Sequence, residues 1–177
     1  YQPAENGEAA INEVMAAIQE TQQETVQLLV LPELFCFDDG LVDPDKIEAA
    51  LQRSQQAINT IREALQDGMY CATSLPLAHE NAVTHMGVLI SAEGMELQQP
   101  QLHQIKRHAG WVDVLGDQLL SIDLPFGRFA LIVGDDSIYP ETFRLAALQQ
   151  VDVVAVPMDV QEAWEVSLGL IERASEN

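Results

Sequence analysis

The sequence predicts a layered α/β fold, in which helices and buried strands alternate along a single domain. The 177 residues are 47% hydrophobic, which is enough for one domain with a sizeable core. Amphipathic segments with helical spacing alternate with short apolar runs, and this order is typical of sheets covered by helices. No internal repeat or linker interrupts the pattern, so we expect one domain over residues 1–177.

The first helix and strand are predicted from the spacing of apolar residues. Within residues 7–22, Ile11 and Ile18 belong to a set of apolar residues at helical spacing, with Glu and Gln on the other face. A nearly continuous apolar run then covers residues 26–31, which favours a strand buried on both faces. Pro32 is expected to end this strand.

Capping residues predict the second helix, over residues 44–66. Asp43 is a plausible N-cap, Pro44 suits the first helical position, and Gly68 suits the stop. The remaining expected elements are strands at 69–75, 83–91, 119–124, 128–133 and 153–156, and helices from Pro140 to about Gln150 and over 160–177. The hairpin turn between 119–124 and 128–133 is Pro-Phe-Gly, and residues 99–118 form the longest irregular stretch.

Charge and composition exclude several classes of function. The chain carries 8 Lys and Arg against 28 Asp and Glu, a formal net charge of −20. A surface with this much negative charge repels phosphate backbones and anionic lipids. We therefore expect no nucleic-acid partner and no membrane partner. No apolar run is long enough to span a bilayer, and no signal peptide is visible.

Two cysteines and four histidines give no sign of a scaffold or metal centre. Two cysteines allow at most one disulfide, so reduced thiols in the cytoplasm are the default expectation. The histidines show no zinc-like spacing with the cysteines, so no metal site and no cofactor are predicted.

Glu33 is the first candidate for catalysis. It follows the apolar strand in Leu-Pro-Glu-Leu-Phe, where partial desolvation would raise the pKa of its carboxyl group and suit a general base. The alternative is a structural carboxylate that caps a loop or pairs with an arginine.

The second candidate is the basic cluster around Lys106, in the irregular stretch. Lys106 is one of two lysines in the chain and lies beside Arg107 and His108. Such a cluster could hold a substrate anion or a developing oxyanion. The alternative is a surface loop that neutralises nearby acids.

The third candidate is the turn between residues 128–133 and the helix that begins at Pro140. A strand followed by a tight turn and a helix is the layout that exposes a nucleophile above a sheet. Gly134 suits such a turn because glycine tolerates positive φ, and Asp135 and Asp136 follow it. The alternative is a tight turn with no chemistry.

Taken together, these three segments resemble the nitrilase superfamily of carbon–nitrogen hydrolases, which uses a Glu–Lys–Cys triad. Glu33 matches the family's base motif, and Lys106 in Lys-Arg-His matches its Lys-x-His motif. Counting back from Pro140-Glu141, the family's cysteine falls on Gly134. Trp164 and the final Arg-Ala-Ser-Glu-Asn also resemble family signatures, so the resemblance covers nearly the whole chain.

The resemblance implies a four-layer αββα sandwich with an unusual site. This chain would lack the family's first strand and the part that follows Asn177, so we expect a domain that is incomplete at both ends and belongs to a longer chain. By the same resemblance, His108, Tyr139 and Glu141 would line a binding site. Gly134 has no side chain with which to form the family's thioester intermediate.

Three functional hypotheses follow. The first is a pseudoenzyme that binds a small amide, amine or carboxylate without hydrolysing it. The second is a divergent hydrolase in which Asp135 or Asp136 attacks or activates water. The third is a domain that serves only as an assembly partner, without a ligand. The resemblance also implies a homodimer.

Overall fold

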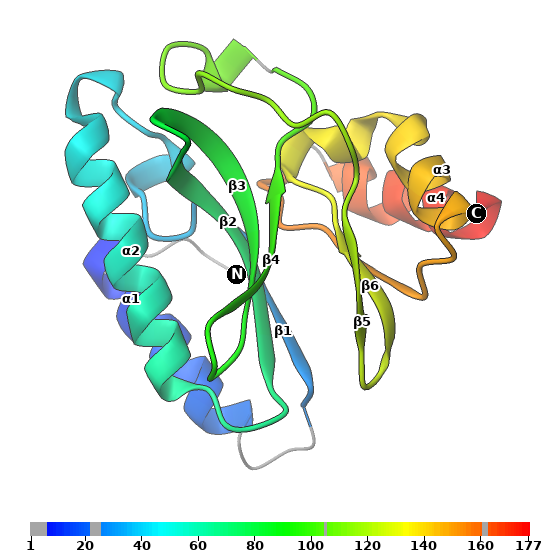
Figure 1. Cartoon of the computed structure of the whole chain (residues 1–177), viewed down its shortest axis with the longest axis horizontal. Helices are drawn as coiled ribbons and strands as arrows, with labels where there is room; N and C mark the ends of the chain where they lie inside the picture. Colours follow the sequence, from blue (N-terminus) through cyan, green and yellow to red (C-terminus); the bar gives the residue numbers. More distant parts are fainter. Residues whose placement is uncertain (1–6, 22–25, 105, 161–162) are drawn as a thin grey trace.

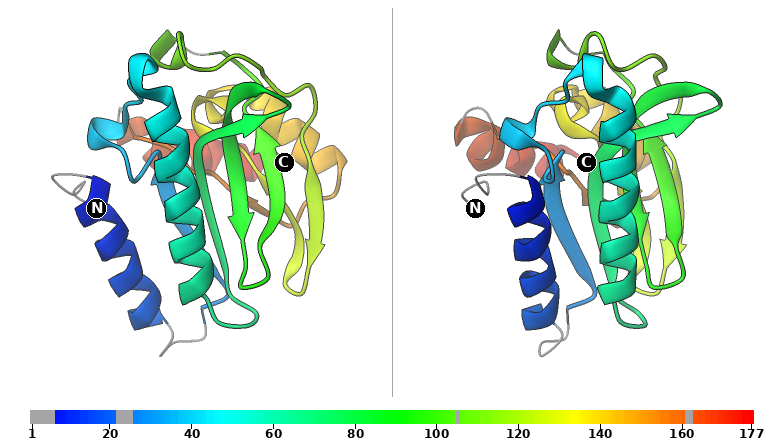
Figure 2. Two further views of the ribbon diagram at one scale, coloured as in Figure 1. Left: turned by 60° about the vertical axis from the view of Figure 1, so that its left-hand side comes forward. Right: turned by 90° about the vertical axis from the view of Figure 1, so that its left-hand side faces the viewer.

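The computed structural model describes residues 7–21, 26–104, 106–160 and 163–177, and it has the predicted mixed α/β architecture. Two sheets pack face to face, and helices cover the outer face of each (Figures 1 and 2). Helices α1 (Gly7–Thr21) and α2 (Ile47–Ala64) lie on the first sheet, whereas α3 (Pro140–Leu148) and α4 (Ile171–Glu176) lie on the second. This order of layers is the expected αββα sandwich.

The first sheet has the order β1-β2-β3-β4, with bounds Leu28–Glu33, Tyr70–His79, Ala82–Ile90 and Met95–Pro100. Strand β1 is parallel to β2, and the other neighbours are antiparallel. The prediction that Pro32 ends the first strand is wrong, because β1 continues to Glu33. Among the described strands β1 lies at the edge of its sheet, where a proline is tolerated.

Strand β4 lies largely in a region for which no strand was predicted. Its exposure alternates, and polar residues such as Gln98 and Gln99 conceal the apolar pattern. Gln99 is nevertheless buried, because its side chain donates to the carbonyl oxygens of Pro100 (2.8 Å) and Gln118 (3.1 Å) and accepts from the N–H of Leu120 (2.6 Å). A hydrogen-bonded glutamine therefore occupies a position that the apolar pattern could not identify.

The second sheet has the order β5-β6-β7, with bounds Ser121–Leu124, Gly127–Leu131 and Val153–Ala155. The predicted hairpin joins β5 and β6, and β7 is parallel to β6. Strand β6 ends just before the segment that carries Gly134, and β7 leads to Pro157 and Asp159. Both segments therefore reach the site described below.

Three apolar layers hold the sandwich together. The central layer packs Ala72, Leu89 and Leu97 of the first sheet against Phe129, Leu131 and Ala155 of the second. Helices α1 and α2 cover a second apolar layer, which includes Ile18 and Ile61. Helix α3 contributes Phe143 and Ala146 to a third layer. No helix in the described segments is long and apolar enough to cross a bilayer.

The predicted helix over residues 160–177 is found in part. Its described portion contains a π-helical turn at Glu165–Leu170 followed by α4. Residues 161 and 162, which the prediction included, lie outside the described residues.

Candidate functional site

Glu33 is the last residue of β1 and lies inside the sandwich, with only 2% of its surface exposed. Its backbone is in register with Ser74 of β2. Its carboxylate accepts a hydrogen bond at Oε1 from the backbone N–H of Asp159, at 3.0 Å. Because Asp159 follows β7, this bond joins the end of a strand in one sheet to the chain that leaves the other sheet.

The turn after Glu33 is held in an uncommon conformation. Leu34 has a φ of +50° and is almost fully buried. Its backbone N–H donates to the carbonyl oxygen of Ser74 at 2.9 Å. A positive φ is costly for a branched side chain, so packing and hydrogen bonding must hold this turn in place. The turn fixes where the Glu33 side chain emerges from the strand.

Two buried histidines lie beside Glu33. His85, in the middle of β3, has its Nε2 atom 3.9 Å from Oε2 of Glu33 and 2.9 Å from the Ser74 hydroxyl oxygen. His108 ends the short 3-10 turn Lys106–His108, and the two imidazole rings meet edge to face with centroids 4.5 Å apart. Gln101 lies between them, with its Oε1 atom 3.3 Å from His85 Nδ1 and 3.1 Å from His108 Nδ1.

Trp111 packs against this polar cluster. Its ring centroid lies 5.5 Å from that of His85 and 5.1 Å from that of His108. The indole is itself only 3% exposed, and both histidines are buried with it. Glu33, the two histidines and Gln101 therefore form a buried polar network in an apolar surround, where polar interactions are stronger than in water.

Gly134 lies directly against the Glu33 carboxylate. It begins the 3-10 turn Gly134–Ile138, has a φ of +51°, and donates its backbone N–H to the carbonyl oxygen of Pro157 at 2.9 Å. A Cβ atom at this position would overlap Oε2 of Glu33 and would lie 3.2 Å from its Cδ. The predicted base and the predicted nucleophile position are therefore adjacent, and the carboxylate occupies the space of a side chain at 134.

Nearly the whole sequence matches a known family. The sequence model described as carbon-nitrogen hydrolase matches residues 1–175. The chain belongs to the carbon–nitrogen hydrolase family.

Solved structures share the fold of this family member. One is a glutamate-to-glutamine mutant of the amidase from Nesterenkonia sp. AN1, which shows Michael addition of acrylamide at its active-site cysteine. It has a TM-score of 0.81 and 21% identity, and the match covers 98% of this chain and 70% of the amidase. Another mutant of that amidase, with the acetamide moiety of fluoroacetamide added to the cysteine, has a TM-score of 0.82 and 20% identity over 98% and 68% of the two chains.

A more distant neighbour is the glutamine-dependent NAD+ synthetase from Acinetobacter baumannii. Its TM-score is 0.77 at 13% identity, over 89% of this chain and 30% of the synthetase. A search of curated proteins returned no match. At these identities the structural likeness shows a common fold, so the chemistry of this family member has to be argued from its own residues.

Neither cysteine of this family member is placed to act as a nucleophile. Cys36 and Cys71 are free thiols that are fully buried. Burial raises the pKa of Cys36 to about 12, although Arg53 opposes the shift, and it raises the pKa of Cys71 to about 12. A thiol with so high a pKa supplies almost no thiolate at neutral pH.

Lys106 lies apart from the buried network. Its side chain is exposed, and the described residues give its ammonium group no ion pair with Glu33. His108, two residues further on, is buried and lies beside Glu33. The role of Lys106 as the family's lysine stays a prediction.

Asp136 holds two segments of the site together. Its carboxylate accepts from the backbone N–H groups of Leu102 (2.8 Å) and His103 (2.9 Å), and its Oδ1 atom lies 2.8 Å from His103 Nδ1. Burial raises the pKa of this carboxyl group, while the hydrogen bonds from Leu102 and His103 oppose the shift. Asp136 therefore ties the turn after β6 to the loop after β4.

The other predicted site residues lie nearer the surface. Asp135 is half-buried in the turn, and Glu141 is exposed in the first turn of α3. Tyr139 is 37% exposed and stacks on His103, with ring centroids 4.0 Å apart. No described contact joins Tyr139 or Glu141 to Glu33.

Sequence reasoning missed His85, Gln101 and Ser74. His85 lies within a predicted strand, where a polar ring beside apolar residues was an available signal. Gln101 follows a strand that was not predicted, and Ser74 has no distinctive neighbour in the sequence. The structure also brings Glu33, His85 and His108 together as possible metal ligands, although histidine and cysteine spacing predicted no metal site.

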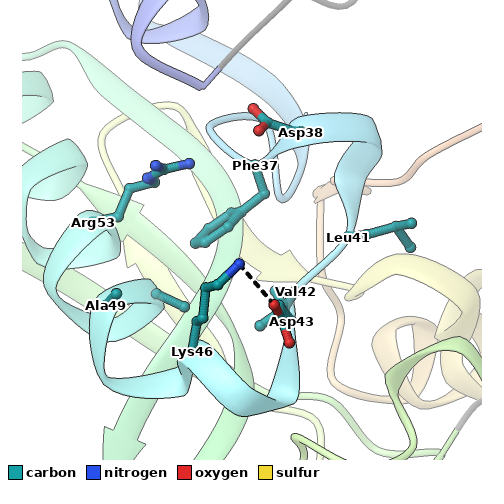
Figure 3. A pocket seen from close by; sticks show the side chains of 9 residues that line it. Phe37, Asp38, Leu41, Val42, Asp43, Lys46, Ala49 and Arg53 are labelled. Carbon is teal, nitrogen blue, oxygen red and sulfur yellow. Dashed lines mark ion pairs between the residues drawn. The ribbon is translucent and has the colours of Figure 1, made fainter.

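A surface hollow lies next to the segment that follows Glu33. It has a volume of about 490 Å³ and lies between the N-terminal part of α2 and the turn Asp38–Gly40 (Figure 3). Lys46 forms an ion pair with Asp43 at 3.1 Å on one side. The guanidinium of Arg53 lies 5.8 Å from the centroid of the Phe37 ring and 3.4 Å from the carbonyl oxygen of Cys36. The hollow thus presents cations, carboxylates and an aromatic face.

Proposed function

We propose that this carbon–nitrogen hydrolase family member binds a small amide, amine or carboxylate and does not hydrolyse it. The observation that carries the proposal is glycine at position 134, against the Glu33 carboxylate. Covalent catalysis in this family, as the resemblance implies, needs a cysteine thiol at that place. Loss of a triad member in serine proteases lowers the rate by a factor on the order of 10⁴–10⁶, and we expect loss of the thiol to act in the same direction here.

The geometry around Gly134 supports this proposal further. A replacement nucleophile would need an ionisable side chain that reaches the same space, and the Glu33 carboxylate fills that space. The two thiols of the chain are buried, with raised pKa values. Their free state also fits a reducing compartment such as the cytoplasm.

The hollow beside α2 is the ligand-binding place that we favour. None of its lining residues is Glu33 or Gly134, but the lining begins at Phe37, in the same turn that follows Glu33. Arg53 offers a planar donor set that suits a carboxylate, and Asp38 offers an acceptor that suits an amine or amide. A volume of about 490 Å³ accommodates a small metabolite.

Ligand binding can be tested by thermal shift with panels of small carboxylates, amines and amides. We expect one class to raise the melting temperature, and we expect Arg53→Gln to remove the response to carboxylates. Arg62→Gln is the matched control, because Arg62 lies on the same helix outside the hollow. If no compound in the three panels raises the melting temperature, that result would contradict ligand binding.

Hydrolysis can be tested with the same compounds, by product detection for the natural chain. We expect no turnover. The second hypothesis, a divergent hydrolase, predicts turnover that Asp135→Asn abolishes, and that result would overturn the first. Asp136 is a weaker choice for this role, because its oxygens already accept from Leu102 and His103.

The assembly hypothesis has its own support in exposed apolar side chains near the C-terminal end. Trp164, Leu168 and Ile171 are each more than half exposed. Such residues are candidates for contact in the proposed homodimer. Light scattering that gives twice the chain mass would support the homodimer, and a monomer at all concentrations would contradict it.

A further inference from the structure

Glu33, His85 and His108 form a compact set of metal-binding groups. One ligand atom from each residue lies within 4.8 Å of the others, and all three residues are buried. They come from β1, β3 and the 3-10 turn at Lys106–His108, so only the fold brings them together. Two imidazoles and one carboxylate are a common donor set for Zn²⁺ and for other divalent transition metals.

Gln101 orients both histidines for this role. Its Oε1 atom lies 3.3 Å from His85 Nδ1 and 3.1 Å from His108 Nδ1. Because a carbonyl oxygen only accepts hydrogen bonds, each Nδ1 atom carries the proton in this arrangement. Each Nε2 atom then carries a lone pair. A metal-bound histidine typically donates its other ring N–H to a carbonyl or carboxylate in this way.

One pair of ligand atoms in the cluster lies near the spacing that a bound ion requires. Nε2 of His85 lies 3.9 Å from Oε2 of Glu33. Ligand atoms about 2.0–2.2 Å from a tetrahedral zinc lie roughly 3.3–3.6 Å from one another. Modest side-chain movement would therefore close the site, and the ion would replace the Ser74 hydroxyl at His85 Nε2, which lies 2.9 Å away.

We propose that Glu33, His85 and His108 bind one divalent transition-metal ion, with Zn²⁺ as the best chemical match, and that Gln101 positions the two histidines. Two imidazole ligands disfavour Mg²⁺ and Ca²⁺, which prefer oxygen. The proposal depends neither on the absence of hydrolysis nor on the hollow beside α2. Metal binding and ligand binding are therefore tested separately.

The direct test is calorimetric titration of the chelator-treated chain with Zn²⁺. Millimolar Mg²⁺ is included to occupy the surface carboxylates, because the chain carries 28 acidic residues. We expect saturation at one Zn²⁺ per chain and a higher melting temperature, which chelator reverses. Absence of saturable binding in the natural chain would overturn the proposal.

Substitutions then locate the ion. His85→Gln and His108→Gln are each expected to weaken Zn²⁺ binding by on the order of 100-fold or more, because each removes a direct ligand. His79→Gln is the matched control, because His79 is exposed at the end of β2. This variant should bind Zn²⁺ as tightly as the natural chain does. Equal binding by both ligand variants and the natural chain would place the ion elsewhere and overturn the proposal.

Two further measurements separate ligation from folding. If circular dichroism shows that His85→Gln fails to fold, His108→Gln carries the test, because His108 lies in a short turn outside the sheets. Gln101→Leu should weaken Zn²⁺ binding about 10–100-fold and change the visible spectrum of the Co²⁺-loaded chain. An unchanged spectrum and affinity would remove Gln101 from the positioning role.

Discussion

At the residue scale, two separate constraints act against a Cβ atom at position 134. The φ of Gly134 is +51°, which lies in the left-handed region, where a side chain is strained. A Cβ atom would also collide with the carboxylate of Glu33, which the Asp159 N–H holds in place. Position 134 therefore accepts a side chain only if both the backbone and Glu33 adjust.

We predict that Gly134→Ala lowers the free energy of unfolding by roughly 2–4 kcal/mol, from strain and overpacking together. Gly68→Ala is the matched control, because Gly68 has a φ of +82° and no atom within 4 Å of an added Cβ. It should cost about 1 kcal/mol from strain alone. Urea denaturation of both variants measures the difference.

A double-mutant cycle isolates the contact with Glu33. In a Glu33→Ala background the carboxylate is gone, so the cost of Gly134→Ala should fall to that of Gly68→Ala. An equal cost in both backgrounds would show that Glu33 does not crowd position 134.

Asp136 is the second residue whose effect is measurable. Replacing it with asparagine leaves an amide group facing backbone N–H donors of Leu102 and His103, which should cost about 1–3 kcal/mol. Burial raises the pKa of the carboxyl group above its ordinary value of 3.8, so the folded state holds the proton more tightly than the unfolded state. Its contribution to stability therefore falls as pH rises through that raised pKa.

We predict that the stability difference between the natural chain and Asp136→Asn decreases as pH rises from about 4 toward neutrality. Asp123→Asn is the control with the opposite sign. Arg128 lowers the pKa of the Asp123 carboxyl group by hydrogen bonding, so the contribution of Asp123 is lost as pH falls. Denaturation from about pH 2 to neutrality measures both, because the Asp136 difference changes above the ordinary carboxyl pKa of 3.8 and the Asp123 difference changes below it. Slopes of the same sign would contradict the prediction.

At the element scale, the close approach of the two sheets depends on Gly87 of β3. A Cβ atom there would lie 2.7 Å from Cγ2 of Val133 and 3.6 Å from Cβ of Leu131. Val133 directly precedes Gly134, so the packing of β3 against the chain after β6 also sets the position of the site. The sheets can come this close only because β3 has no side chain at position 87.

We predict that Gly87→Ala costs about 1–3 kcal/mol by overpacking this contact. The double variant Gly87→Ala with Val133→Ala should recover part of that loss, because it removes the methyl group that the new Cβ would meet. Thermal and urea unfolding measure the effect. If the second substitution only adds its own cost, the sheets are not in contact as described.

At the scale of the whole molecule, the net charge of −20 opposes folding through self-repulsion. The described ion pairs, such as Lys46–Asp43, Arg128–Asp123 and Arg173–Glu176, lie at or near the surface and offset little of it. Stability must therefore come mainly from the three apolar layers of the sandwich.

We predict that salt stabilises this protein. Raising NaCl from about 0.05 to 0.5 M shortens the screening length from roughly 14 to 4 Å, which weakens repulsion among the surface acids. The urea midpoint should move upward. A midpoint that falls with salt would mean that favourable ion pairs outweigh the repulsion.

Much of the fold could be predicted from sequence, because local patterns specify it. Helical spacing identified α1 and α2. The side chain of Asp43, the predicted N-cap, accepts a hydrogen bond from the N–H of Asp45 at 3.0 Å. The β5–β6 hairpin lies where its turn residues predicted it. The prediction failed for Pro32, which lies within an edge strand. It also failed at β4, where buried Gln99 replaces an apolar residue.

By itself, the sequence determined the layered α/β class and the acidic surface, which depend on local pattern and composition. Its resemblance to a family supplied the four-layer order and named Glu33 and Gly134 as site positions. Only the tertiary structure decided which side chains meet. Burial placed His85, Gln101 and His108 beside Glu33 and left Lys106 exposed. These residues come from separate strands and turns, so their contacts depend on how two sheets pack, and no spacing along the chain encodes that distance.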